Sequence, residues 1–164
     1  GAANLSYQQL LVRNALRGEC IGRFMQPDVK SVPPQLTVQE LLDAHVYKYQ
    51  HKMFPVIERD EVIGCVTTRD VKAVPISEWP RRHVSEIAQP CSVENTIDQG
   101  EDAFRALSKM HSSGNSRLMV TDNGRLVGVV CLKDLLGFIA MKIELEEGRE
   151  TPRRNNEESS RHAA

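Results

Sequence analysis

The sequence lacks the features that mark several large classes of protein. Its 164 residues include 21 Lys and Arg against 22 Asp and Glu, and the formal net charge of −1 argues against a nucleic-acid-binding protein and against a polyacidic tail. No apolar run approaches the roughly 20 residues of a membrane-spanning helix, and no signal-peptide pattern opens the chain. We therefore expect a module that works in water, in the cytoplasm.

Metal-binding and catalytic motifs are also missing. The four cysteines form no C-x-x-C pair, and none of the five histidines stands in an H-E-x-x-H motif. The sequence shows no nucleophile–base pair and no dinucleotide-binding G-x-G-x-x-G pattern. We expect reduced thiols, no metal site and no catalytic residues in this chain.

What the sequence does contain is an internal repeat. Two gap-free windows share four identical residues in register: Val56 and Val120, Gly64 and Gly128, Val66 and Val130, and Asp70 and Asp134. Apolar matches arise easily between strands, but chance less readily aligns a glycine and an aspartate as well. The chain therefore holds two copies of one structural unit.

Each copy is predicted to form a short extended segment, a helix, two strands and a second helix. Apolar residues recur at helical spacing over 38–49 and 103–110, and runs of β-branched residues follow. Asn123-Gly124 is typical of a hairpin turn with positive φ. The first copy has Arg59-Asp60 in that place, so its turn is less clearly specified.

Punctuating residues divide the chain into five parts. Ser6 to Gln9 predicts a capping box that opens a helix ending near Gly18. The parts are an N-terminal linker helix (1–20), a first unit (21–76), a linker (77–83), a second unit with a C-terminal helix (84–147) and a polar tail (148–164) that we expect to be disordered.

These residues resemble a tandem CBS-domain pair, or Bateman module. The resemblance rests on Phe54-Pro55-Val56 and on the G-h-h-T-x-x-D sequence of 64–70, which is partly repeated over 128–134. It covers approximately Ile21 to Ile143. It implies an α+β fold in which two β-α-β-β-α units stack with pseudo-two-fold symmetry, each a small sheet covered by helices.

A narrower resemblance concerns the flanking sequences. Residues 6–11, Arg17-Gly18, Arg23-Phe24-Met25 and the stretch from Thr68 to Pro75 with Trp79 look similar to the cytosolic C-terminal region of site-2-protease-type zinc metalloproteases. The resemblance implies that this chain is part of an integral membrane protease whose catalytic domain, and its zinc, lie outside this sequence.

The T-x-x-D turn is the strongest candidate for a binding site. Thr67 ends a strand that runs into a helix, where backbone N–H groups favour anions, and its hydroxyl can donate to a phosphate. Asp70 can accept from ribose hydroxyls, and Arg69 or Lys133 can bind phosphate. Alternatively, Thr67 and Asp70 only cap the helix.

The resemblance implies that this site is an adenosine-binding cleft between the units. The base would lie against an apolar edge made by Val32, Met53, Phe54 and Pro55. In the second copy Asp134 corresponds to Asp70, but Cys131 is a poor phosphate donor and Arg117 crowds or neutralises that half. We therefore expect at most one good site.

Two functions remain open at this point. The first is a regulatory module that binds AMP, ADP, ATP or S-adenosylmethionine, requires no cofactor, and controls an attached membrane zinc metalloprotease. The alternative is a structural dimerisation module without a ligand. In both cases the resemblance implies a homodimer.

Overall fold

Two β-hairpins organise the molecule. In the computed structural model, which describes residues 2–147, β1 (Met53–Glu58) pairs antiparallel with β2 (Glu61–Thr67), and β5 (Arg117–Asp122) pairs with β6 (Arg125–Cys131). Both turns have two residues with positive φ, 52° and 64° at Arg59-Asp60 and 51° and 79° at Asn123-Gly124. The first turn thus adopts the geometry of the second without a glycine.

Short strands complete two three-stranded sheets. β3 (Gln89–Pro90) pairs antiparallel with β2, and β4 (Thr96–Asp98) pairs parallel with β5. In the first unit the place of β4 is taken by Val32, which forms a parallel bridge to Val56. The predicted α+β arrangement of two small sheets covered by helices is therefore confirmed.

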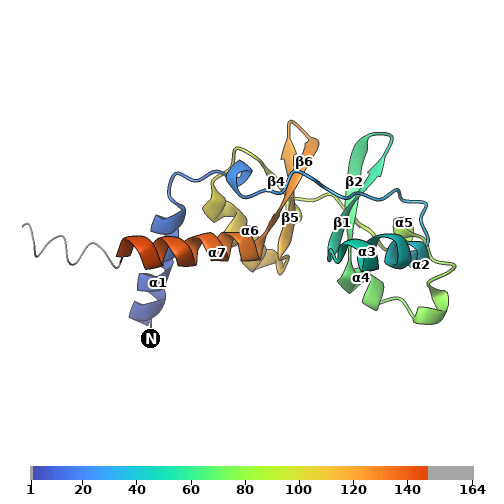
Figure 1. Ribbon diagram of the computed structural model, residues 1–164, viewed down its shortest axis with the longest axis horizontal. Helices are drawn as coiled ribbons and strands as arrows, with labels where there is room; N and C mark the ends of the chain where they lie inside the picture. Colours follow the sequence, from blue (N-terminus) through green and yellow to red (C-terminus); the bar gives the residue numbers. More distant parts are fainter. Residues whose placement is uncertain (1, 148–164) are drawn as a thin grey trace, which may run out of the picture.

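Helices cover both sheets on the side away from the hairpin turns (Figure 1). In the first unit α2 (Val38–Leu41), the π-helical turn η2 (Leu42–Val46) and α3 (Tyr47–Tyr49) run on from one another, and α4 (Thr68–Lys72) follows β2. In the second unit α6 (Ala103–Ser113) precedes β5, and α7 (Leu132–Lys142) continues into η4 (Ile143–Glu147). The short η3 (Ile76–Glu78) follows at the end of the first unit, and α5 (Val84–Ile87) begins the second.

The N-terminal helix begins earlier than its sequence predicts. α1 spans Ala2–Leu16, so Ser6 lies inside the helix and the predicted capping box there is wrong. The residues before Ser6 include Ala2, Ala3 and Leu5, which favour helix strongly enough to extend it. The helix ends close to Gly18, whose φ is +77°, as predicted. The tail that we expected to be disordered lies outside the described residues.

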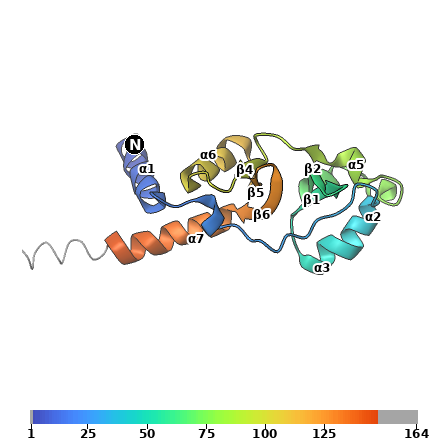
Figure 2. The ribbon, with the colours of Figure 1, turned by 90° about the horizontal axis from the view of Figure 1, so that it is seen from above.

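The two units exchange the segments that lead into them. Ile21, in the short helix η1 (Ile21–Arg23), is fully buried in the core of the second unit, together with Leu16, Leu118 and Leu135. Conversely, Val84 in α5 is fully buried in the core of the first unit. Figure 2 shows α1 beside α6 and α7, and the chain running from there to the first unit.

The exchange continues in the sheets. Gln26 bridges to Val129 in β6, and Gln89 pairs with Cys65 in β2, so each crossing segment adds to the sheet of the other unit. Both segments pass over a glycine. A Cβ on Gly64 would lie 2.1 Å from the carbonyl oxygen of Gln89, and one on Gly128 would lie 2.9 Å from that of Gln26. The repeated glycine is therefore required for close backbone approach.

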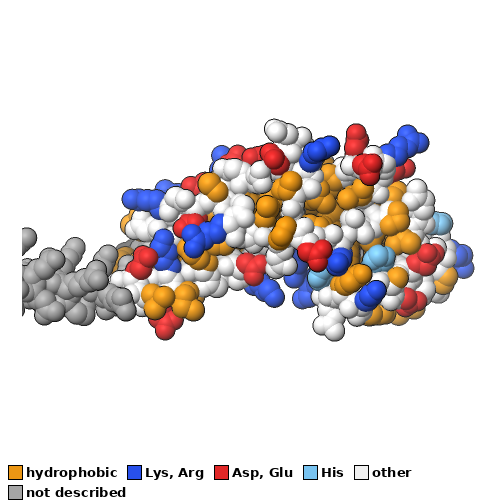
Figure 3. All heavy atoms as spheres, turned by 45° about the horizontal axis from the view of Figure 1, so that its top comes forward, with side chains coloured by type: hydrophobic (Ala, Val, Ile, Leu, Met, Phe, Trp, Pro, Cys, Tyr) orange, Lys and Arg blue, Asp and Glu red, His pale blue; other side chains and the backbone are white. Residues whose placement is uncertain are grey.

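A small apolar cluster joins the units between the hairpins. Met53, Cys65 and Met119 are buried there, with Val62, Leu126 and Val129 against them. Figure 3 shows apolar side chains between the two hairpins and charged ones at their outer ends. Because β2 and β6 face each other across this cluster, the ends of these strands are brought to the junction. The T-x-x-D motif lies at the end of β2, and its C-x-x-D counterpart lies at the end of β6.

The close approach at Gly64 predicts a sharp effect of a single methyl group. We expect Gly64→Ala to lower the free energy of unfolding by about 2 kcal/mol, because the Gln89 backbone would have to move away from β2. The melting temperature should fall by roughly 4–8 °C in differential scanning calorimetry.

The matched control is Gly137→Ala, because Gly137 lies in α7 and a Cβ there meets nothing within 4 Å. That change should stabilise the protein by up to about 1 kcal/mol. Equal stability of Gly64→Ala and the unaltered protein would contradict the exchanged arrangement.

Candidate functional site

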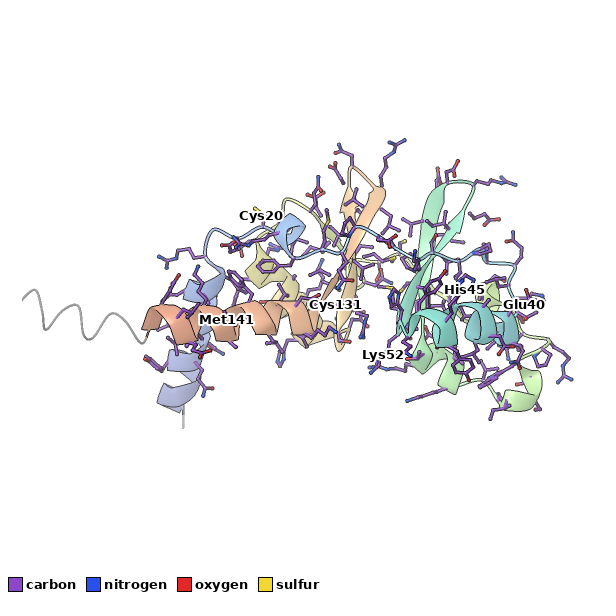
Figure 4. All side chains as sticks on the ribbon, in the orientation of Figure 1. Cys20, Glu40, His45, Lys52, Cys131 and Met141 are labelled. Carbon is purple, nitrogen blue, oxygen red and sulfur yellow. The ribbon has the colours of Figure 1, made fainter. Side chains whose placement is uncertain are left out.

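Two of the clefts at the junction lie at the strand ends, one at each repeat of the motif. The first, here called the threonine cleft, has a volume of about 300 Å³ and includes Thr67, Arg69, Gln89 and Arg117 among its lining residues. The second, the cysteine cleft, has about 190 Å³ and includes Cys131, Lys133 and Gln26. Figure 4 labels Lys52, which lines the first cleft, and Cys131, which lines the second. Only the first reaches the lower end of the roughly 300–1,000 Å³ typical of small-molecule sites.

Thr67 and Asp70 form a complete capping box at the start of α4. The Thr67 hydroxyl accepts from the Asp70 N–H at 3.2 Å, and Asp70 Oδ2 accepts from the Thr67 N–H at 2.9 Å and from its hydroxyl at 3.0 Å. One oxygen of the carboxylate is thus committed to the helix start. The capping role that the sequence left open is present in the structure.

The other oxygen of Asp70 accepts a hydrogen bond from the exchanged segment. Gln89 Nε2 donates to Asp70 Oδ1 at 3.0 Å, and in the second unit Gln26 Nε2 donates to Asp134 Oδ2 at 3.2 Å. The glutamines line the two clefts, whereas the two aspartates do not. Each aspartate therefore lies behind a glutamine amide.

The threonine cleft is strongly cationic. Four basic side chains, from both units, line it: Lys52, Arg69, Lys72 and Arg117. Its lining contains no Asp or Glu, and none of the four forms a salt bridge with a carboxylate of the described residues. Arg117 donates to the neutral Ser116 hydroxyl at 3.0 Å. Such a cleft favours a multiply charged anion.

The cysteine cleft differs in its chemistry. Cys131 occupies the position of Thr67 and makes no side-chain cap for α7. Burial raises the pKa of the Cys131 thiol, although nearby Arg117 lowers it in part. Lys30, Arg117 and Lys133 line the cleft, but Asp28 does so too and lies 3.5 Å from Lys30 Nζ. This cleft is therefore smaller and less uniformly cationic.

The structure separates the site residues that the sequence grouped together. Thr67 and Arg69 line the threonine cleft, Pro55 and Lys133 line the cysteine cleft, and Met53 and Arg117 line both. Val32 and Phe54 are buried in the first unit's core and line neither cleft, while Asp70 and Asp134 stand behind their glutamines. The apolar residues that we expected to contact the base therefore do not form one continuous surface with Thr67.

Sequence reasoning missed several residues that line the threonine cleft, among them Lys52, Lys72 and Gln89. The glutamines do carry a signal, because Met25-Gln26-Pro27 and Ala88-Gln89-Pro90 repeat an apolar-Gln-Pro pattern. Its offset is one residue shorter than that of the hairpins, so a gap-free comparison does not align the two glutamines. The lysines carry no repeat signal of their own.

Cys65, which also lines the threonine cleft, has an unreactive thiol. Burial, helped by the charge of Asp70, raises the pKa of this thiol to about 11, so it stays protonated at neutral pH. Within residues 2–147 no three His, Cys, Asp or Glu side chains are grouped so that they could hold a metal ion. Among the same residues, no helix has the length and apolar character needed to cross a membrane.

Comparison with known proteins identifies both halves of the chain. The family model of the CBS domain matches residues 21–76 and 84–141. A relative named "Putative zinc metalloprotease Rip3", from Mycobacterium tuberculosis (strain ATCC 25618 / H37Rv), is 27% identical over 137 residues, which are 82% of this chain and 34% of the relative. The chain thus spans about a third of that protein's length.

Solved structures share the fold. The CBS domain of a bacterial CNNM/CorC family Mg²⁺ transporter in complex with ATP has a TM-score of 0.69 at 20% identity, over 81% of this chain and 97% of that one. CBSX2 in complex with AMP has a TM-score of 0.67 at 22% identity, over 77% of this chain and 99% of that one. At these identities the likeness concerns the fold.

The difference between the two helix starts predicts the effect of a swap. Cys131→Thr should supply the missing cap of α7 and raise the free energy of unfolding by about 1 kcal/mol. The reverse change, Thr67→Cys, should remove a cap that is present and cost a similar amount. Urea unfolding of both variants measures this. Opposite signs are expected, and a loss of stability in both would contradict the assignment.

Proposed function

Since the chain belongs to the CBS-domain family as a tandem pair, we propose that this regulatory module binds an adenine nucleotide in the threonine cleft. The observation that carries the proposal is the group of four basic side chains, unopposed by any lining acid, between the two units. Phosphate groups satisfy such a group through charge-assisted hydrogen bonds. The relatives in complex with ATP and AMP support this choice of ligand.

The cleft also favours a nucleotide over S-adenosylmethionine. The sulfonium of that compound is positively charged, and it carries no phosphate to place among Lys52, Arg69, Lys72 and Arg117. Repulsion between like charges would oppose its binding. Of the two adenosyl ligand classes considered, the phosphorylated one fits the charge of the site.

Regulation follows from the fact that both units line the cleft. Arg69 and Lys72 come from α4 of the first unit, and Arg117 comes from β5 of the second. A ligand that contacts both sides binds best to one arrangement of the units and shifts the population toward it. The module thereby converts nucleotide concentration into a change between the segments attached to its two ends.

The similarity to Rip3 suggests what is attached. We propose that, in a longer protein, this module is joined to a membrane zinc metalloprotease domain, faces the cytoplasm and controls that domain. The zinc would belong to the protease domain. The module itself needs no cofactor for this role.

Calorimetry tests the nucleotide proposal. ATP should bind with measurable heat, more weakly at higher salt because the contacts are ionic, and S-adenosylmethionine should give none. Arg117→Ala should weaken ATP binding roughly tenfold or more, because hydrogen bonds to charged groups contribute about 1.5–3 kcal/mol.

The matched control is Arg125→Ala, which removes an arginine of the same sheet from the hairpin end instead of the cleft. It should leave ATP binding unchanged. Absence of heat at millimolar ATP, with the protein folded by circular dichroism, would refute the proposal.

A second candidate function, dimerisation, is favoured by an apolar groove. A groove of about 1120 Å³ lies between α1, α6 and α7 and is lined by Leu10, Phe104, Leu107 and Leu136. Leu10 and Leu136 are 57% and 48% exposed. Exposed apolar patches of this kind often mark contact surfaces.

Sedimentation equilibrium tests this second function. The protein should form a dimer that persists in high salt, because its contacts would be apolar. Leu136→Glu, at an exposed position of α7, should then yield a monomer. A monomer at all concentrations of the unaltered protein would exclude dimerisation as the function.

A further inference from the structure

We propose that Gln89 is a specificity-determining residue of the threonine cleft, because its amide competes with a ribose for Asp70. The inference rests on the proposed nucleotide function and adds to it. In the structure Gln89 Nε2 donates to Asp70 Oδ1 at 3.0 Å, and Gln89, not Asp70, lines the cleft. A nucleotide that enters the cleft therefore contacts the Gln89 amide first and the Asp70 carboxylate only after it.

The lone pairs of Asp70 are largely in use. Oδ2 accepts from the N–H and the hydroxyl of Thr67, which hold it in the capping box of α4. A carboxylate oxygen offers about two acceptor positions, so only one position on Oδ1 stays open beside Gln89. The 2′ and 3′ hydroxyls of a ribose need two acceptor positions side by side. Binding of both hydroxyls requires the Gln89 amide to leave.

The local structure allows that departure. The Gln89 side chain is exposed, so it can change rotamer without disturbing the core. Its backbone is held in place, because it pairs with Cys65 and crosses Gly64 at close range. Displacement of the amide is thus a side-chain movement that leaves the sheet intact.

The effect on specificity follows from this competition. A ribonucleotide must break the Gln89–Asp70 hydrogen bond, whereas a nucleotide without the 2′ and 3′ hydroxyls has no use for Asp70 and loses nothing to Gln89. With Gln89 in place, the cleft discriminates weakly between the two sugars and binds chiefly through phosphate. Without the amide, Asp70 is open and the ribose is recognised.

The repeat provides a matched control. Gln26 donates to Asp134 at 3.2 Å in the cysteine cleft, and both glutamines are exposed. Its removal should affect the stability of the exchanged segments in the same way as removal of Gln89. It should not affect a ligand in the threonine cleft.

The experiment is calorimetric titration of ATP and 2′,3′-dideoxy-ATP into the unaltered protein, Gln89→Ala and Gln26→Ala. We expect Gln89→Ala to tighten ATP binding roughly 3- to 10-fold, in the range of the net contribution of one typical hydrogen bond, and to leave dideoxy-ATP unchanged. Gln26→Ala should change neither. Gln89→Met, which keeps the length of the side chain but lacks the donor, should behave as Gln89→Ala does.

The outcomes separate this inference from the function on which it rests. If ATP binds the unaltered protein and Gln89→Ala binds it equally or more weakly, the competition is refuted while the nucleotide site stands. An equal gain for ATP and dideoxy-ATP also refutes it, because the gain would not involve the ribose. If no variant binds ATP, both proposals fail together.

Discussion

The structure depends on the exchange of the two leading segments. Each unit completes its core with a residue from the start of the other unit, Ile21 in one case and Val84 in the other. Each crossing segment passes over a glycine, Gly64 in β2 or Gly128 in β6, where a side chain would block the backbone. This arrangement determines how the two units are placed against each other and where both clefts lie. It also explains why residues 64 and 128 are glycines.

Equivalent backbones nevertheless carry different chemistry. The pseudo-two-fold relation gives both clefts a glutamine over an aspartate at a helix start. Only the first retains the threonine, and only the first collects basic side chains without a lining acid. The two repeats thus form two similar clefts. Differences at a few lining positions make only one of these clefts suitable for a polyanion.

The sequence was a good guide to the units and a poorer guide to their junction. Local patterns predicted the hairpins and the repeated glycine and aspartate, because strand alternation and turn residues act over a few positions. They could not say which sheet an edge segment joins, so the crossing of Gln26 and Gln89 was missed. They also grouped Phe54 with Met53, although neighbours on a strand point to opposite faces, one into the core and one to the junction.

The exchange also determines how the chain can be divided. A cut anywhere between η3 and α5 would leave the first fragment holding Ile21 and Gln26, which the second needs, and the second holding Val84 and Gln89, which the first needs. Neither fragment could complete its hydrophobic core or its sheet alone. The two pieces complement each other, so a cleaved chain would refold only if its pieces associated. The covalent linker makes this association intramolecular.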